Sequence, residues 1–201
     1  FPTRRSSDLF SKITDAIRDE CNIDFNTAFL DGSKFEADAN KYKFVWKPTK
    51  YHQKLSDKIR IILSKYELSR NVPETGIIPA TTIADKITKF NNLISNIDIS
   101  DKSNKEIFKD YEFLKSALIK SLEYEEKEKI CGPDRNSYYK TDHDATAMCL
   151  KRDYYSGLGT NTHAAYNTQI IVCKGLIATY YVSQSRSDLK DLIPALDKFY
   201  D

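Results

Sequence analysis

The hydrophobic residues of this 201-residue chain change their spacing along the sequence, and that change limits the folds available to it. Over the middle of the chain they recur at the three- and four-residue spacing of an amphipathic helix. After Tyr166 they form short β-rich runs, 168–172 and 176–182, on either side of Cys173-Lys174-Gly175. These runs predict an antiparallel hairpin. We therefore expect a helix-rich α+β protein.

Apolar stripes predict helices that begin near Phe10, Leu55, Ile83 and Ile107. The last of these is expected to end near Gly132, which can supply the stop. Segment 50–131 then forms a helical insertion. It separates a short buried strand, expected over 27–30, from the hairpin. A closing helix is predicted over 188–196, with Pro194 either tolerated in it or breaking it.

Net charge says little about partners, because 31 basic residues nearly balance 29 acidic ones. Any nucleic-acid surface must therefore be local. The cysteines have no paired spacing, so we expect buried thiols in a cytoplasmic protein. They are Cys21, Cys131, Cys149 and Cys173.

Two alternatives involve the same thiols. A zinc site could use His143, Cys149, His163 and Cys173, and a nucleophilic pair could join His163 to Cys149 or Cys173. The zinc set lacks the tight paired spacing of known zinc sites. A nucleophilic pair forms in space and not in sequence, and nothing in the sequence favours it over buried thiols and a solvent histidine.

Residues 1–9 resemble the translation of a sequencing-library adapter and are set aside as an artefact, so the natural amino terminus is expected to be missing. The alternative interpretation is a basic, disordered arm that contacts phosphates. We expect no signal peptide and no membrane-spanning segment, because no apolar core follows Arg4 and Arg5.

Asp31-Gly32 follows an apolar approach and has two possible explanations. As a pattern alone it favours a turn between two strands. Alternatively, Asp31 lies at the edge of a sheet, where a carboxylate suits Mg²⁺ or Mn²⁺ and phosphodiester chemistry. In that case Gly32 marks a close approach to the backbone.

A second block, 132–148, is rich in groups that can donate to phosphate and in aromatic rings, as in a DNA-facing loop. A plain connector in which Asp142 caps a short helix through Met148 explains the same pattern. Asp142, His143 and Asp144 could also be metal ligands, although close neighbours in sequence seldom converge.

The chain resembles the transposases of the IS1182 insertion-sequence group in three segments that occur in the same order. They are 31–46, which begins Asp31-Gly32-Ser33-Lys34-Phe35-Glu36, then 135–146, and then 166–169, Tyr166-Asn167-Thr168-Gln169. The resemblance implies a DDE transposase over 10–201 with a partial ribonuclease H-like core: strand, helical insertion, antiparallel hairpin and helix. It implies that Asp31 is the first catalytic acid and a ligand of Mg²⁺ or Mn²⁺. Ala165 departs from the glycine that these transposases usually have.

The second acid of such enzymes lies in an Asp-x-Gly-Tyr-like context and the third is a Glu on a later helix, and neither motif is present in 1–201. Asp188 matches a helix start instead. Complete relatives use two metal ions to cut transposon ends and join them to target DNA. The chain is thus expected to be an inactive fragment.

The implied partners are terminal inverted repeats and target DNA, with homo-oligomers of the full-length protein and a place at the bacterial nucleoid. Six basic residues are candidates for DNA contact, although each could instead be a solvated surface charge. They are Lys34, Lys41, Lys43, Lys47, Arg135 and Lys140. The competing interpretation is a non-enzymatic helical module that binds nucleic acid or another partner.

Overall fold

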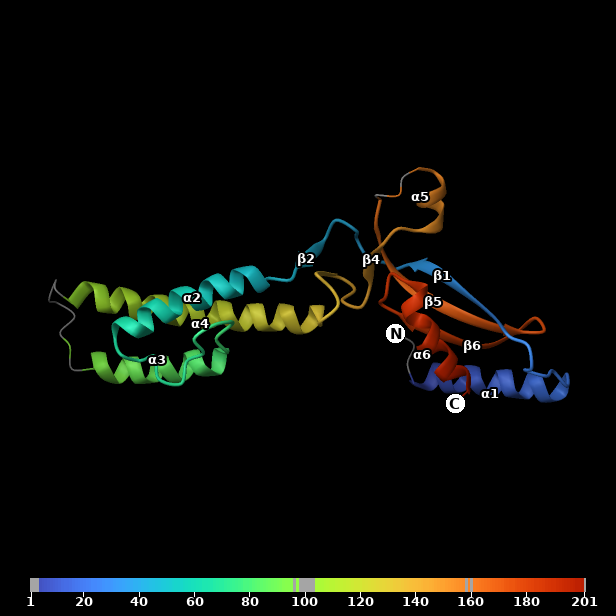
Figure 1. Cartoon of the computed structure of the whole chain (residues 1–201), viewed down its shortest axis with the longest axis horizontal. Helices are drawn as coiled ribbons and strands as arrows, with labels where there is room; N and C mark the ends of the chain where they lie inside the picture. Colours follow the sequence, from blue (N-terminus) through green and yellow to red (C-terminus); the bar gives the residue numbers. More distant parts are fainter. Residues whose placement is uncertain (1–3, 96, 98–103, 158, 160, 201) are drawn as a thin grey trace. The chain divides into compact units, whose positions relative to one another are not determined.

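The computed structural model describes residues 4–95, 97, 104–157, 159 and 161–200. Part of the expected artefact at 1–9 lies outside these residues. The chain is a mixed α+β protein, as expected, and it divides into two compact units (Figure 1). Unit 1 comprises 1–45 and 137–201, and unit 2 comprises 46–136.

Unit 2 consists of helices α2 (Thr49–Lys65), α3 (Ala80–Ile94) and α4 (Lys105–Cys131), and all three predicted helices are confirmed. Both α2 and α3 contact α4, and their apolar stripes meet in one core. Ile59, Phe90 and Leu114 in that core are completely buried. Gly132 ends α4 with a φ of 66°, a conformation that favours glycine.

Unit 1 contains an antiparallel sheet in which β5 (His163–Cys173) is central. One side of β5 pairs with β1 (Phe29–Glu36) along its whole length. The other side pairs with β6 (Leu176–Ser183) and with the short β4 (Thr146–Met148). The predicted hairpin of β5 and β6 is confirmed. Its two-residue turn has positive φ at Lys174 (46°) and Gly175 (87°), as a type I′ turn requires.

The strand at Asp31 differs from the one expected over 27–30. β1 begins at Phe29 and continues to Glu36, and residues 27–29 are exposed. The apolar run therefore coincides only with the start of β1. The rest of the strand, through Glu36, is defined by its pairing with β5.

Several short elements were not predicted. β2 (Phe44–Trp46) pairs with β3 (Ser137–Tyr139), and α5 (Lys151–Tyr155) follows β4. The helix expected through Met148 is wrong, because those residues form β4 against the start of β5.

Helices α1 (Arg4–Glu20) and α6 (Asp188–Tyr200) complete unit 1. α6 packs on β5 and β6 and tolerates Pro194 within it. α1 contacts β6, where the ring of Phe10 meets the edge of Tyr180 with centroids 5.0 Å apart. Among the described residues, no helix is long and apolar enough to cross a membrane.

Candidate metal and nucleic-acid site

Asp31 is the third residue of β1 and lies opposite Ile170 of β5. The hairpin-turn interpretation of Asp31-Gly32 is therefore wrong, because both residues lie within a continuous strand. The Asp31 side chain is 84 % exposed, and its Oδ2 lies 3.8 Å from Nζ of Lys151. A pair this exposed contributes little to stability. The carboxylate of Asp31 is accessible to solvent.

Gly32 is buried and has close neighbours, as its sequence context predicted. A Cβ atom at this position would lie 2.7 Å from Oδ1 of Asp188 and 2.7 Å from Nε2 of Gln169. Gly32 therefore faces α6. Because side chains alternate along a strand, Asp31 points to the opposite face and Lys34 to the face of Gly32.

Asp188 is the first residue of α6, in agreement with its assignment to a helix start. Its Oδ1 accepts hydrogen bonds from Nδ2 of Asn167 at 2.8 Å and from Nε2 of Gln169 at 3.2 Å. Asn167 also donates to Oδ2 of Asp191 at 3.0 Å, and the Ser183 hydroxyl donates to Oδ1 of Asp191 at 2.8 Å. We call these five residues the α6 anchor.

The α6 anchor does not suit a cation, because N–H and O–H donors occupy the space between its carboxylates. Burial, together with the neighbouring charge of Asp188, raises the pKa of Asp191 despite its hydrogen bonds. The anchor thus attaches the amino end of α6 to the sheet.

Asp31 suits a metal ion by the type of its side chain but not by the ligands around it. A carboxylate is a suitable ligand for Mg²⁺, which prefers six oxygens in octahedral geometry. In the part of the chain that the structure describes, no group of three or more His, Cys, Asp or Glu side chains is placed to hold a metal ion. A single carboxylate does not make a two-metal centre, so we derive no reaction step through a metal here.

The thiols give no support to a nucleophilic pair. Cys173 is buried, and burial raises the pKa of its thiol, which disfavours the reactive thiolate. Cys131 is also buried, Cys149 is half-buried and Cys21 is exposed. The expectation of buried thiols is therefore wrong for Cys21.

The structure brings two of the predicted basic residues together in unit 1. The backbone N–H of Lys140 donates to the carbonyl of Lys43 at 3.0 Å, and both side chains are exposed. Lys41 differs, since its Nζ donates to Oδ1 of Asn161 at 2.9 Å. Lys43 and Lys140 thus lie on adjacent backbone segments with exposed side chains.

Lys47 and Arg135 come together in unit 2 at the carboxyl end of α4. Nζ of Lys47 donates to the carbonyl of Gly132 at 2.6 Å, and Nη2 of Arg135 donates to that of Ile130 at 2.6 Å. Cationic groups at this end satisfy the last carbonyls and oppose the negative pole of the helix dipole. These contacts give both charges a structural role, and their contact with DNA stays a prediction.

In the loop before β4, Asp142 makes local capping bonds without starting a helix. Its Oδ1 accepts from the backbone N–H groups of Asp144 and Ala145 at 3.1 and 3.2 Å, and its Oδ2 accepts from the Tyr166 hydroxyl at 2.6 Å. Burial alone would raise the pKa of Asp142, but these hydrogen bonds outweigh it and hold that pKa below its ordinary value.

A buried polar triad in unit 2 was not predicted. Nε2 of His52 lies 2.9 Å from Oγ of Ser121, and Nδ1 lies 3.1 Å from Oε2 of Glu128. The order resembles a Ser-His-acid triad, but His52 and Ser121 are wholly buried and no substrate can reach the hydroxyl. The triad is a structural link between α2 and α4.

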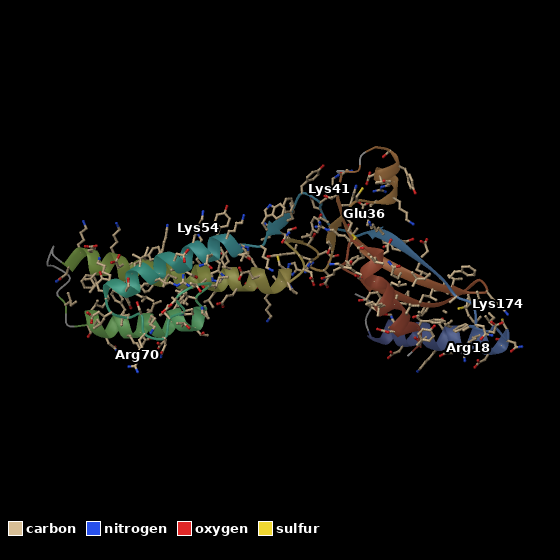
Figure 2. The ribbon with its side chains drawn as sticks, viewed as in Figure 1. Arg18, Glu36, Lys41, Lys54, Arg70 and Lys174 are labelled. Carbon is tan, nitrogen blue, oxygen red and sulfur yellow. The ribbon has the colours of Figure 1, made fainter. Side chains whose placement is uncertain are left out.

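A second cluster that sequence reasoning missed surrounds His163, the first residue of β5. Nδ1 of its ring lies 2.6 Å from Oε1 of Glu36, and Nε2 lies 3.0 Å from Oδ2 of Asp153. Arg152 also donates to Oε2 of Glu36 at 2.6 Å. Hydrogen bonding to His163, and then to Arg152, lowers the pKa of Glu36. Figure 2 labels Glu36 and Lys41 near this end of the sheet.

Comparisons with the models of known protein families, with curated proteins and with solved structures each gave no match.

Proposed function

We propose that this chain is part of the catalytic domain of a DDE transposase, and that unit 1 contains the beginning of a ribonuclease H-like core. The observation that carries this proposal is the antiparallel order β1-β5-β6 followed by α6, with Asp31 exposed in the first strand. In the sequence, unit 2 lies between β1 and β5, where the resemblance to IS1182-group transposases implies a helical insertion.

Residues 1–201 supply one carboxylate of the expected three, so we assign no cleavage to this span. The activity assigned to it is DNA binding, with Lys43 and Lys140 in contact with phosphates. Their exposed side chains on adjacent backbone segments support this assignment. A DNA substrate would also place the protein at the bacterial nucleoid.

Paramagnetic Mn²⁺ tests the role of Asp31. In nuclear magnetic resonance spectra of the chain with duplex DNA, we expect Mn²⁺ to broaden the amide signals around Asp31, because DNA phosphates complete a weak site on the carboxylate. The broadening should disappear in Asp31→Asn and persist in Asp38→Asn, which removes another exposed acid. Equal broadening in both variants would contradict the proposal.

Cleavage provides the complementary test. With Mg²⁺ and transposon-end DNA, residues 1–201 should give no nicks above background. Robust nicking that Asp31→Ala abolishes would show that the other two acids are not needed.

The second candidate function is a non-enzymatic nucleic-acid-binding or interaction module. It is favoured by the exposed side chains of Lys43 and Lys140, which need no metal to meet phosphate. DNA binding that Asp31→Asn and Mg²⁺ both leave unchanged, together with an absence of Mn²⁺ broadening, would favour this candidate.

A further inference from the structure

Basic and aromatic residues alternate along the segment that contains β2. This segment reads Lys41-Tyr42-Lys43-Phe44-Val45-Trp46-Lys47. Because side chains alternate along a strand, Phe44 and Trp46 lie on one face of β2 and Val45 lies on the other. Phe44 is 41 % exposed and Trp46 is 65 % exposed. Two large rings therefore share an accessible face of one strand.

The rings of β2 differ in burial from those of the strand beside it. In β3, which pairs with β2, both Tyr138 and Tyr139 are buried. The aromatic residues of β3 thus contribute to packing, whereas those of β2 meet solvent. Single exposed apolar residues are common, but a group of large ones rimmed by polar residues marks a binding surface.

The backbone of β2 is fixed by hydrogen bonds at both of its ends. The N–H of Lys140 donates to the carbonyl of Lys43 at 3.0 Å, and the N–H of Lys47 donates to the carbonyl of Asn136 at 2.8 Å. A ring on a paired strand loses less freedom on binding than a ring on an open loop, because its backbone is already ordered. β2 therefore presents its two rings on a preorganised backbone.

The charge around these rings favours an anionic partner. Segment 41–47 has three lysines and no acidic residue. Lys43 and Lys140 have exposed side chains next to the strand. Lysine is depleted in protein–protein interfaces, so its alternation with aromatic residues favours a nucleic acid over a protein.

Single-stranded nucleic acid matches both features of this surface. It offers phosphates to cations and bare base faces to aromatic rings. In a duplex the neighbouring bases cover those faces, so a ring on a protein surface can stack only on unpaired bases. Tyr42 already has a cation beside its ring, since Nζ of Lys41 lies 5.3 Å from the ring centroid. The two rings of β2 are therefore the ones that we assign to bases.

We propose that β2 is a stacking platform for single-stranded DNA, in which unpaired bases stack on Phe44 and Trp46 and the phosphates meet Lys43 and Lys140. This platform rests on the proposed DNA-binding function and adds its substrate class, unpaired DNA. Trp46 is the only tryptophan of the chain, so its fluorescence reports directly on stacking.

Two probes of equal length test the platform with the full chain: an oligothymidylate of about 16 nucleotides and a duplex of the same length. In fluorescence anisotropy at low salt, the single strand should bind at least as tightly as the duplex despite its lower charge density, because stacking adds to the phosphate contacts. It should also quench the fluorescence of Trp46. The duplex should leave that fluorescence nearly unchanged.

Variants separate stacking from electrostatic attraction. Phe44→Leu and Trp46→Leu each remove a flat ring but keep an apolar side chain and the charge of the surface. Each should weaken binding of the oligothymidylate at least about 5-fold, the loss that corresponds to one stacked base, and leave duplex binding unchanged. The matched control Tyr155→Leu, at a residue 83 % exposed on α5, should affect neither probe.

Replacing both Lys43 and Lys140 with Ala should instead weaken the binding of both probes, because both carry phosphates. Circular dichroism of each variant checks that it remains folded.

Three results would overturn the platform while DNA binding itself stands. One is an oligothymidylate affinity that neither Phe44→Leu nor Trp46→Leu changes. Another is an equal loss of affinity for both probes in these variants, since a ring that stacks on bases acts only on the single strand. The third needs no variant: bound oligothymidylate that leaves the fluorescence of Trp46 unchanged. If neither probe binds at low salt, the proposed DNA binding fails and the platform fails with it.

Discussion

Gly32 leaves room for the side chains of Asp188 and Gln169 beside β1. Both neighbours are fixed by the α6 anchor, so they cannot move away at little cost. The glycine at position 32 predicted this close approach. The pattern Asp31-Gly32, taken alone, favoured a turn instead of a strand. That preference failed because turn statistics are local, whereas the pairing of β1 with β5 joins residues far apart in the chain.

Gly32→Ala should destabilise unit 1 by about 1–3 kcal/mol, the usual cost of forcing a methyl group into a packed site. Urea unfolding followed by circular dichroism, with hydrogen exchange of the β1 and β5 amides to report on unit 1, measures this loss. The matched control is Gly159→Ala, where the nearest atom to the new Cβ would be 4.0 Å away. Equal stability of the two variants would show that the side chains of Asp188 and Gln169 can move away from the new methyl group without loss of stability.

Tyr166→Phe removes the hydroxyl that donates to Asp142, and it should cost about 1–3 kcal/mol at neutral pH, as for bonds to charged groups. The pKa of Asp142 is lower in the folded than in the unfolded chain. The carboxylate therefore stabilises the folded state above the unfolded pKa of an Asp, and this stabilisation is lost as pH falls through the folded pKa of Asp142. The difference between variant and natural chain should therefore shrink on acidification. Tyr200→Phe, at a side chain 80 % exposed, should change little at any pH. A Tyr166→Phe effect that does not depend on pH would contradict this account.

Among the elements, the long helices were predictable and the short strands were not. The stripes of α2, α3 and α4 repeat over several turns, so their period is clear in the sequence. β2, β3 and β4 have three residues each, too few for a period, and they exist only through pairing with distant strands. The cluster at His163 was missed for the same reason, since Glu36 lies 127 positions away.

The α6 anchor makes a prediction for one element. Asn167→Ala removes the donor shared by Asp188 and Asp191, and it should destabilise unit 1 by about 1–3 kcal/mol because Oδ2 of the buried Asp191 loses its donor. Hydrogen exchange should show α6 losing protection before β5 does. Asn91→Ala, which removes an exposed bond to Tyr111, serves as the control and should cost less than about 1 kcal/mol. Uniform loss of protection over unit 1 would contradict the local role of the anchor.

At the scale of the whole molecule, unit 2 has a hydrophobic core of its own. A fragment 46–136 should therefore fold alone into a helical structure with a cooperative thermal transition in circular dichroism. Phe90→Ala should destabilise that fragment by about 3–5 kcal/mol, since Phe90 is completely buried. The exposed Leu93→Ala should have a much smaller effect. A fragment without a cooperative transition would show that unit 2 needs unit 1 to fold.

The central proposal for this span is DNA binding through Lys43 and Lys140, and a binding titration tests it most directly. Fluorescence anisotropy of a labelled duplex should show an affinity that falls steeply between about 50 and 200 mM salt. Replacing both Lys43 and Lys140 with Ala should weaken binding and reduce the magnitude of the salt slope by about 2, or about 1 for each phosphate contact. The control replaces Lys12 and Lys190, exposed on α1 and α6, and should leave the slope unchanged. Binding that ignores salt, or the absence of binding at the lowest salt, would contradict the claim.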